Sequence, residues 1–407
     1  MLIAQKKFFT FSTLALASML SFSAYAANES YVVVAPVCLA KNFSAKHETL
    51  VANDKFALIK TNDAGLNQLI AAKDHQKTVC GGFINVTDSW AQQTALTSHD
   101  AKAFLQRYTK PQSAALKKES NDYSIKYEKQ VSQLLAAVNP QNMWDKLTKL
   151  TSFTDRYSRA DTGVEAATWI KNQVEALAKQ YGRDDVKVYL IETGGSYKQP
   201  SVVAKLGTSD EPGIVIGGHM DTLQAWFGNM PGADDDGTGT VTVLETARNL
   251  FSSHMQFKKP IYLIWYSAEE MGLVGSQRVV AEFKKKNIPV SDVIHFDMTG
   301  YANHNDPTMW LLSDNTNPEL TAYLADLIKA YVKQPVKYTT CGYACSDHAT
   351  WNMNGYKAAI AFESEGHDYN PNIHSAEDTM SQISLTHMTD YAKLAIAFAV
   401  ERAEPVA

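Results

Sequence analysis

Five short segments of the sequence carry carboxylate and imidazole side chains of the kinds that bind metal ions or move protons. Three of them stand at the ends of apolar, strand-like stretches, one is an acidic turn ahead of a helix, and one is a loop. In that order they read GIVIGGHMDT (213–222), YSAEEMG (266–272), HFDMTG (295–300), PGADDDGTGT (231–240) and DYNPNIHSAEDT (368–379).

The first segment places a histidine and an aspartate on one face of an extended chain. Residues i and i+2 of an extended backbone point the same way, so His219 and Asp221 share a face. The carboxylate could then hold one ring nitrogen while the other nitrogen binds a metal ion. A single His-x-Asp is a weak signal, because an ordinary hydrogen bond explains most examples.

Two further segments are more acidic than folding alone requires. One aspartate would suffice to cap the helix that is predicted to begin near Thr240, yet residues 234–236 are all aspartate. Glu269 and Glu270 are adjacent and cannot aim at one point, which suggests that one binds metal while the other transfers protons. Taken alone, this pair is equally compatible with a solvated acidic turn.

Charge arithmetic connects the segments. Gathering one aspartate of the acidic turn with Asp297 and Glu270 would place three negative charges together, and the five segments contain no lysine or arginine. Such a cluster is costly to bury unless it is neutralised. Two divalent cations with a bridging hydroxide would balance it, and His219 and His374 would give each cation one nitrogen. This donor set favours zinc, and a two-metal site lowers the pKa of the shared water.

The elements that must position these residues alternate between strands and helices from about residue 125 onward. We expect strands at 187–192, 201–206, 213–217, 260–266 and 292–298, and helices at 131–138, 144–150, 163–181, 240–251, 275–286 and 318–331. This alternation predicts an α/β fold with a largely parallel sheet covered by helices. In such sheets the reactive side chains gather beyond the carboxyl ends of the strands.

A small α/β module precedes this region. Strands are expected at 31–38, 55–61 and 78–86, with a helix at 66–73. The polar residues 109–125 (TKPQSAALKKESNDYSI) follow and contain Lys117-Lys118. A stretch of this composition is typical of a linker that proteases cut.

The first 26 residues predict export. A basic pair at 6–7 precedes an apolar run over 8–22, and Ala-Tyr-Ala at 24–26 supplies a cleavage site. The alternative is a membrane anchor, for which the run is short. We therefore expect a secreted protein, extracellular or periplasmic, without membrane association after cleavage.

In an oxidising compartment the four cysteines should form disulfides. Three pairings are possible, and Cys38–Cys80 with Cys341–Cys345 is favoured because each pair then lies within one region of the chain. Metal binding by these thiols is the weaker alternative, since no CxxC pair accompanies them.

Composition narrows the class of protein further. The 407 residues are 45% hydrophobic and 20% charged, which is typical of a folded chain and excludes disordered and coiled-coil classes. Lysine and arginine total 38 against 43 acidic residues, a formal net charge of −5. Because no strong positive field exists to hold a phosphate backbone, we expect no nucleic-acid partner.

Together with CGYACSDH (341–348), these segments closely resemble the secreted bacterial leucyl aminopeptidases that carry a co-catalytic zinc pair. The motifs GGHMD, PGADDDGTG, AEEMGLVGS, DMTGY, CGYACSDH and DYNPNIHSAEDT occur in order over residues 145–400, and CGYACSDH is specific to this group. The resemblance implies a zinc-exopeptidase fold, a mixed, mostly parallel central sheet flanked by helices on both faces and preceded by a small α/β pro-domain. Residues before about 125 lie outside the resemblance.

The resemblance also assigns roles to single residues. The implied ligands are His219, Asp235 and Asp297 for one Zn²⁺, and His374, Glu270 and Asp235 for the other, with a water or hydroxide as second bridge. Asp221 is implied as the partner of the first histidine, Glu269 as the general base, and Tyr343 as a hydrogen-bond donor to the oxyanion. Asp235 is chosen by the resemblance alone, since chemistry does not separate it from its two neighbours.

The implied reaction is hydrolysis of the N-terminal peptide bond of a peptide. By the same resemblance, the first residue's side chain would enter a mostly apolar pocket lined by Met298, Cys341, Tyr343, Cys345, Ile360, Phe362, Tyr369 and Ile373. This predicts a preference for leucine, and Gly366, where relatives are expected to have an aromatic residue, should also admit phenylalanine and tyrosine. Glu365 is the competing signal, because a carboxylate in the pocket would favour lysine or arginine.

Other functions fit the motifs less well. A glutaminyl cyclase shares the implied fold but uses a single zinc, a carboxypeptidase needs a basic group that the motifs lack, and a non-catalytic relative would have lost ligands. We expect a signal peptide at 1–26, a pro-region at 27–124 and a catalytic domain at 125–407. The expected partners are peptides with a free N-terminus and a protease that processes this zymogen, and the expected state is a monomer.

Overall fold

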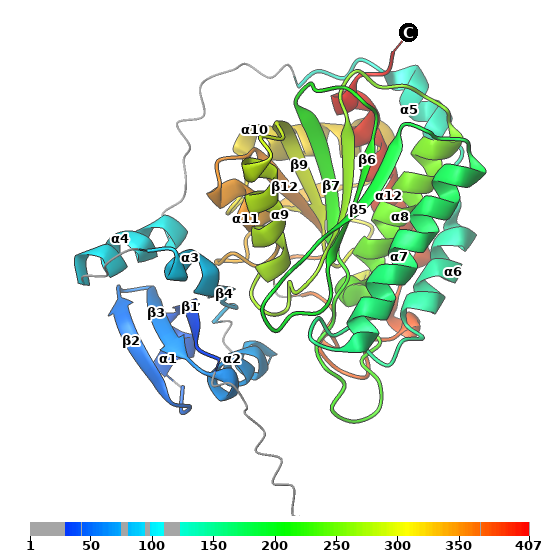
Figure 1. Ribbon diagram of the computed structural model, residues 1–407. Helices are drawn as coiled ribbons and strands as arrows, with labels where there is room; N and C mark the ends of the chain where they lie inside the picture. The colour runs from blue at the N-terminus through cyan, green and yellow to red at the C-terminus, as the bar shows by residue number, and fades with distance from the viewer. Residues whose placement is uncertain are drawn as a thin grey trace, which may run out of the picture.

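The computed structural model describes residues 29–41, 43–74, 80–93, 98–109, 123–366 and 368–406. The expected signal peptide and the Lys117-Lys118 pair lie outside these residues. Two units pack against each other (Figure 1). We call them the N-terminal module (described residues from 29 to 109) and the main unit (described residues from 123 to 406).

The main unit is built on an eight-stranded mixed sheet. Its strands lie in the order β11-β10-β12-β9-β7-β8-β6-β5. The central strands β12, β9, β7 and β8 are mutually parallel, whereas β6 and β10 run antiparallel to their central neighbours. The bounds are β5 Val186–Ile191, β6 Ser201–Leu206, β7 Gly213–His219, β8 Ile261–Tyr266, β9 Val290–Phe296, β10 Met309–Leu312, β11 Val336–Thr339 and β12 Ala358–Phe362. The expected mixed, mostly parallel sheet is confirmed.

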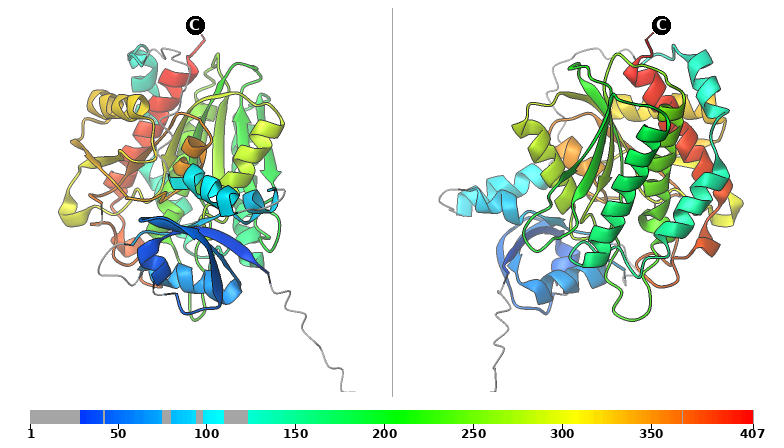
Figure 2. Two further views of the ribbon diagram at one scale, coloured as in Figure 1. Left: turned by 90° about the vertical axis from the view of Figure 1, so that its left-hand side faces the viewer. Right: turned by 45° about the vertical axis from the view of Figure 1, so that its right-hand side comes forward.

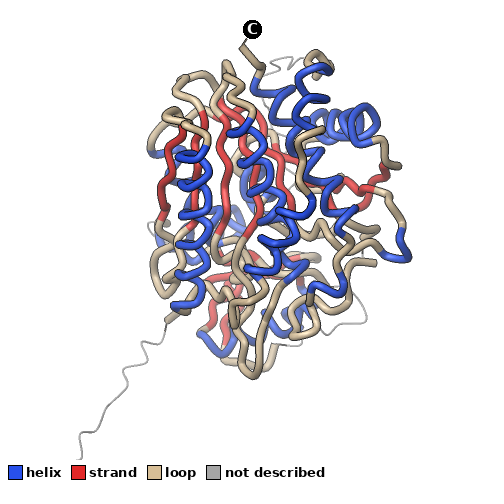
Figure 3. The backbone as a smooth tube through the Cα atoms, turned by 90° about the vertical axis from the view of Figure 1, so that its right-hand side faces the viewer, coloured by secondary structure: helices blue, strands red, loops and turns tan. Residues whose placement is uncertain are grey.

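Helices cover both faces of this sheet (Figures 1 and 3). One layer contains α5 Glu128–Leu135, α6 Pro140–Leu150, α7 Asp161–Gln180, α8 Gly239–Ser252, α10 Pro318–Leu327 and α12 Leu385–Ala403, and the other contains α9 Val274–Lys285 and α11 His348–Met353. Side chains of β7 alternate between the two layers, since Ile214 and Ile216 pack in the first core and Val215 in the second. A strand buried on both faces reads as a continuous apolar run, which is why its position was predictable.

Several elements were absent from the expected set. The strands β10, β11 and β12 have only four or five residues, too few for a clear alternation. The helix α12 is buried on nearly all sides, so no polar stripe marks its period. The helix expected at 318–331 ends at Leu327 and continues as a π-helical turn, η3 Ile328–Val332.

The N-terminal module is a four-stranded antiparallel sheet with helices around it. Its strands lie in the order β2 His47–Ala52, β3 Phe56–Thr61, β1 Tyr31–Pro36 and β4 Ile84–Asn85, and its helices are α1 Val37–Lys41, α2 Asp63–Asp74, α3 Thr87–Ala91 and α4 Ser98–Thr109. The strand expected at 78–86 is represented among the described residues by β4 alone. Disulfides join Cys38 to Cys80 and Cys341 to Cys345, so the favoured pairing is confirmed.

Three parallel strands deliver the chemical residues to one edge of the main sheet. β7 ends at His219, β8 ends just before the Glu269-Glu270 pair, and β9 ends one residue before Asp297. The carboxyl ends of parallel strands meet at one edge, as the sequence predicted. The N-terminal module packs at this edge (Figure 2). There the backbone N–H of Asn85 donates to Gly272 O at 3.0 Å. Within the described ranges, no helix combines the length and apolar character needed to cross a membrane.

Candidate active site

Two groups of potential metal ligands lie at this edge and share one residue. His219, Asp235 and Asp297 form one group, and Asp235, Glu270 and His374 form the other; within each, one ligand atom per residue lies within 4.8 Å of the others. The Nε2 atom of His219 is 3.0 Å from one carboxylate oxygen of Asp235, and the Nε2 atom of His374 is 2.9 Å from the other. Asp235 therefore faces both histidines at once.

The donor set of these groups fits zinc. Each group combines one imidazole nitrogen with carboxylate oxygens, which is a combination that zinc accepts. The five residues are buried or nearly so, and Asp297 Oδ1 is a buried oxygen without a hydrogen-bond partner. Buried carboxylates at this spacing repel one another unless cations neutralise them. The residues of each group therefore fit a zinc ion.

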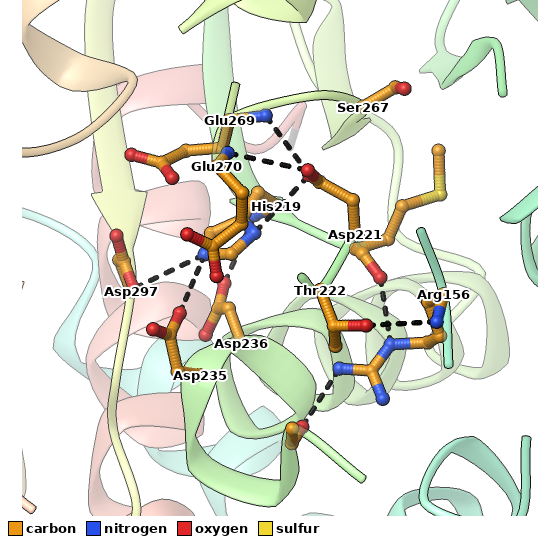
Figure 4. A network of polar contacts seen from close by, with 12 residues as sticks. Arg156, His219, Asp221, Thr222, Asp235, Asp236, Ser267, Glu269, Glu270 and Asp297 are labelled. Atoms are coloured by element: carbon orange, nitrogen blue, oxygen red, sulfur yellow. Dashed lines mark hydrogen bonds and ion pairs between the residues drawn. The ribbon is translucent and has the colours of Figure 1, made fainter. Parts of the chain in front are cut away.

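Asp221 organises the surroundings of the first histidine (Figure 4). Its carboxylate lies 3.4 Å from His219 Nδ1 and accepts hydrogen bonds from the backbone N–H of Glu269 at 3.0 Å and of Glu270 at 3.3 Å. Burial opposes protonation of His219, but the adjacent carboxylates, Asp297 foremost, raise its pKa well above the ordinary value. One buried carboxylate thus sets both the ring orientation and the backbone of the two glutamates.

The three consecutive aspartates of the acidic turn have different partners. Asp236 accepts hydrogen bonds from the backbone N–H groups of His219, Gly239 and Met298 at 2.8–3.1 Å. Asp234 accepts one from the backbone N–H of Gly300 at 3.1 Å. Only Asp235 of the three belongs to the ligand groups. The geometry thus assigns different roles to the three aspartates, which residue type alone could not do.

The two adjacent glutamates also diverge. The carboxylate of Glu270 lies 3.1 Å from His374 Nε2 and belongs to the second ligand group. Glu269 belongs to neither group and lines the pocket beside Asp235 and Asp297. The split into one ligand and one proton carrier is therefore compatible with the positions of both side chains.

Two residues beneath the site were not expected from the sequence. Arg156 is fully buried and donates to the backbone carbonyls of Met220, Pro231 and Gly232, which belong to the His219 and Asp235 segments (Figure 4). It supplies one positive charge that the motif arithmetic lacked, and its side-chain hydrogen bonds go to backbone carbonyls. Because it lies outside every motif, only its tertiary contacts reveal it.

The other unexpected residue is Asp378, which links two ligand loops. Its carboxylate accepts hydrogen bonds from the backbone N–H groups of Asp234 at 3.0 Å and Asp235 at 3.1 Å, and it lies four residues after His374. Glu363 lies in the same buried cluster. Burial raises the pKa of Asp234 to about 6 and raises the pKa values of Asp378 and Glu363 well above their usual range. Its position four residues after the ligand histidine was the one sequence signal available.

An apolar pocket opens on the ligand groups. Its lining includes all the expected pocket residues, namely Met298, Cys341, Tyr343, Cys345, Ile360, Phe362, Gly366, Tyr369 and Ile373, together with Leu312 and Ser346, which were not expected. Asp235, Asp297, Glu269 and His374 form its polar side. Glu365 instead lines a separate surface depression with Asp306 and Lys337.

Two histidines close to the motifs stay outside the ligand groups, as expected. His295 Nε2 lies 2.8 Å from Ser346 Oγ, which is an ordinary structural hydrogen bond. His348 is fully buried, and burial lowers its pKa to about 3. Neither residue belongs to the two ligand groups found among the described residues.

Comparisons with known proteins agree with this geometry. The model of "Peptidase family M28" matches residues 201–399. Leucine aminopeptidase 1 of Emericella nidulans is 36% identical over 289 residues, which are 68% of this chain and 74% of that protein. The chain belongs to peptidase family M28. The family recognised in the sequence, and the expectation of a zinc-dependent metallo-aminopeptidase, are thereby confirmed.

Solved structures of M28 relatives extend the similarity to most of the chain. The LapA aminopeptidase of Legionella pneumophila is 42% identical, with a TM-score of 0.86 over 93% of this chain and 100% of that one. LapB from the same organism is 39% identical, with a TM-score of 0.84 over 92% of this chain and 100% of that one. These shares exceed the portion that follows residue 125, so the similarity includes part of the N-terminal module.

Proposed function

We propose that this M28 chain is a secreted di-zinc aminopeptidase that removes bulky apolar residues from the N-termini of peptides. The observation that carries the proposal is the apolar pocket whose polar side is formed by members of two ligand groups sharing Asp235. A first residue seated in this pocket has its carbonyl and amine beside those groups. Leucine aminopeptidase 1 of Emericella nidulans, at 36% identity, supports the same substrate class.

The side chains divide the work of hydrolysis. Glu269, which lines the pocket beside the ligands, takes a proton from the attacking water and passes it to the leaving amine. Asp221 fixes the backbone on which Glu269 stands, through the hydrogen bond of 3.0 Å. Tyr343, at the rim beside Cys345, donates a hydrogen bond to the oxygen that becomes negative.

Zinc held here would supply Lewis acidity, which would polarise the carbonyl and lower the pKa of water so that Glu269 can deprotonate it near neutral pH. His219, Asp235 and Asp297 would hold one ion, and His374, Glu270 and Asp235 the other. A glutaminyl cyclase with a single zinc is the competing assignment. Two zinc ions per chain by elemental analysis support the peptidase, and one tightly bound ion would favour the cyclase.

The pocket lining supports an apolar preference. Its walls are mostly aliphatic and aromatic, and a buried methylene contributes about 0.8 kcal/mol. Gly366 contributes no side chain, which leaves room for an aromatic first residue. Glu365 lines a different depression, so its carboxylate does not line the pocket to select lysine or arginine.

The division of the chain and its location belong to the same proposal. We assign residues 1–26 as a signal peptide, 27–124 as a pro-region and 125–407 as the catalytic domain of a monomer. Two disulfides suit an oxidising compartment. A processing protease would cut the polar stretch that includes Lys117-Lys118.

A panel of amino-acid amides tests the assignment. Leucinamide, phenylalaninamide, alaninamide and lysinamide are compared at equal concentration on processed enzyme, with and without a chelator. Leucine should exceed alanine by about tenfold to a few hundredfold, and the chelator should abolish turnover. Lysinamide as the best substrate would replace the apolar assignment by a basic one, and no turnover of any amide would contradict aminopeptidase activity.

A further inference from the structure

We propose that Gly272, Gln277 and Tyr343 form the site that binds the substrate's backbone downstream of the cleaved bond, and that the N-terminal module blocks this site with a segment resembling such a peptide. The segment is residues 80–86, which we call the strap. The ligand is thus an extended peptide, and in the full-length chain the strap takes its place. This inference rests on the proposed aminopeptidase function.

The strap binds the main unit through its own main chain. The backbone N–H of Asn85 donates to Gly272 O at 3.0 Å, and Gln277 Nε2 donates to the carbonyl oxygen of Asn85 at 2.9 Å. Both polar groups of one strap residue are therefore paired. These two bonds fit the backbone of any extended peptide, as in other peptide-binding sites that add a strand. The Asn85 amide, which donates to the Tyr197 hydroxyl at 3.2 Å, and the buried Phe83 ring add contacts that are specific to the strap.

The glycine at position 272 makes this approach possible. A Cβ atom there would lie 2.6 Å from the backbone nitrogen of Asn85 and 2.9 Å from the ring of Phe83. The surface is thus open at the point where a peptide backbone must come close. A substrate accepted with many different downstream residues needs a surface of this type.

A second close approach occurs beneath Tyr343. A Cβ atom on Gly81 would lie 2.5 Å from the Tyr343 ring, and one on Gly82 would lie 3.1 Å from it. Gly81 and Gly82 have no side chains, so the backbone of the strap lies directly against the Tyr343 ring at these two residues. The side chain that we assign to the oxyanion is therefore covered by the module.

The strap and a bound substrate would have the same polarity. Gly82 and Phe83 line a small cavity together with Glu269, whereas Asn85 lies beside Gln277 and Arg278. The amino-terminal part of the strap therefore lies nearer to the general base, Glu269, than its carboxyl-terminal part does. A peptide whose first residue fills the apolar pocket would leave the base in that direction, with Gly82 and Phe83 replacing its next residues.

The strap covers only the downstream half of the site. Among the described residues, none from the N-terminal module lines the apolar pocket. The strap also offers no free amine to the ligand groups, because the chain continues upstream through Cys80, which is bonded to Cys38. It can thus occupy the site without being cleaved by an enzyme that requires a free N-terminus.

The first experiment compares two neighbours on α9 in zinc-loaded enzyme processed from the folded full-length chain. For Gln277→Ala, the kcat/KM for leucyl-triglycine relative to that for leucinamide should fall about tenfold through KM, since one backbone hydrogen bond is lost. Arg278→Ala is the matched control, because Arg278 pairs with Asp88 of the module at 2.6 Å and should leave the ratio unchanged. Equal ratios in wild type and Gln277→Ala would overturn the proposal. If wild type hydrolysed neither substrate, the aminopeptidase function itself would fail.

The second experiment uses the strap as a free peptide. Acetylated GGFINV amide (residues 81–86) should inhibit leucyl-triglycine hydrolysis by the processed enzyme competitively. The same peptide methylated on the backbone nitrogen that corresponds to Asn85 should inhibit about tenfold more weakly, because it cannot donate to Gly272 O. Equal inhibition by the two peptides would show that the hydrogen bond from the Asn85 backbone N–H to Gly272 O contributes nothing to peptide binding, and would contradict the proposed site.

Discussion

Asp235 stands between Asp236, both of whose carboxylate oxygens accept from backbone N–H groups, and Asp234, one of whose oxygens accepts from the backbone N–H of Gly300. The carboxylate of Asp235 itself faces both histidines. The same logic separates Glu269 from Glu270, whose backbone N–H groups share the carboxylate of Asp221 while their side chains diverge. Roles at this scale follow from which neighbour each oxygen meets. They do not follow from residue type.

The adjacent glutamates should therefore fail in different ways when each is removed. Glu269→Ala should remove nearly all turnover with zinc content unchanged, since the side chain carries protons and lies outside both ligand groups. Glu270→Ala should lose one zinc as well as activity. Turnover of leucinamide and zinc per folded chain, measured together, check this. Zinc loss in Glu269→Ala with retention in Glu270→Ala would reverse the roles.

A fully buried histidine, His348, predicts a pH effect on stability. His348 has no hydrogen-bond partner on either ring nitrogen, and burial lowers its pKa to about 3 from the usual 6.5. The unfolded chain therefore binds a proton there between pH 6.5 and about 3 when the folded chain does not. The contribution of neutral His348 to the free energy of unfolding is fully present above pH 6.5. It is lost as the pH falls, by about 1.4 kcal/mol per pH unit.

His348→Phe isolates this contribution. The free energy of unfolding of the variant, measured in urea with a chelator from pH 7.5 to 5, should decrease less on acidification than that of the wild type. His254→Gln, at an exposed position, should follow the wild type. If the free energy of unfolding changed with pH in parallel for wild type and His348→Phe, protonation of the buried ring would not explain the loss of stability in acid.

The ligands were predictable because each motif stands at a strand end or loop of recognisable composition. Arg156 and Asp378 were not, since one lies outside all motifs and the other lies within a segment where only the histidine attracted attention. Their function is to hold backbones, through carbonyls for Arg156 and N–H groups for Asp378. Such contacts join segments distant in sequence and leave no local pattern.

At the scale of elements, predictability depended on how each one is buried. β7 and β8 lie between two helical layers and read as apolar runs, so their bounds were found within about two residues. The helix α12 is also buried but was missed, because burial on nearly all sides removes the polar face that marks a helix. β10 to β12, which carry part of the pocket, are short and became visible only in the folded sheet.

The burial of α12 makes its packing a stability prediction. Phe398 is fully buried in the largest core, against the sheet whose edge carries the site. Phe398→Ala should lower the free energy of unfolding by about 3–5 kcal/mol through lost contacts and the cavity that remains. Thr386→Ala, at an exposed position in the same helix, should change it by less than about 0.5 kcal/mol. Urea denaturation of the three proteins gives the comparison, and equal losses would contradict the packing argument.

At the scale of the whole molecule, two kinds of contact hold the module on the main unit. Apolar clusters contain residues of both units, such as Phe83 with Met271 and Val34 with Leu273, and polar contacts flank the strap. Arg159 of the main unit pairs with Asp63 at 3.0 Å, donates to the Tyr31 hydroxyl at 2.7 Å, and lies over the rings of Tyr31 and Tyr197. Arg278 pairs with Asp88 on the other side. Partly exposed ion pairs each contribute little, typically about 0–1 kcal/mol. After a cut between the units, non-covalent contacts alone hold the module, since its Cys38–Cys80 disulfide is internal, and the module can dissociate on dilution.

Cutting should therefore raise activity. The full-length chain should hydrolyse leucyl-triglycine slowly, and limited proteolysis in the stretch that includes Lys117-Lys118 should increase the rate as the module dissociates. Activity and size are followed together on one sample. An unchanged rate after complete cleavage and loss of the module would exclude an inhibitory pro-region.

Removing the contacts of Arg159 with the module should have the same effect as cutting the chain between the two units. Arg159→Ala in the full-length chain removes the ion pair with Asp63 and the contact with Tyr31, so the strap should leave its site for a larger fraction of the time. Losing about 1 kcal/mol of this hold predicts a roughly fivefold higher rate on leucyl-triglycine before any cleavage. The same substitution in processed enzyme should change little, because the described partners of Arg159 in that network lie in the module except for Tyr157 and Tyr197. A rate that rose equally in both forms would place the effect in the catalytic site. A rate that rose in neither form would show that Arg159 does not help to hold the module on the main unit.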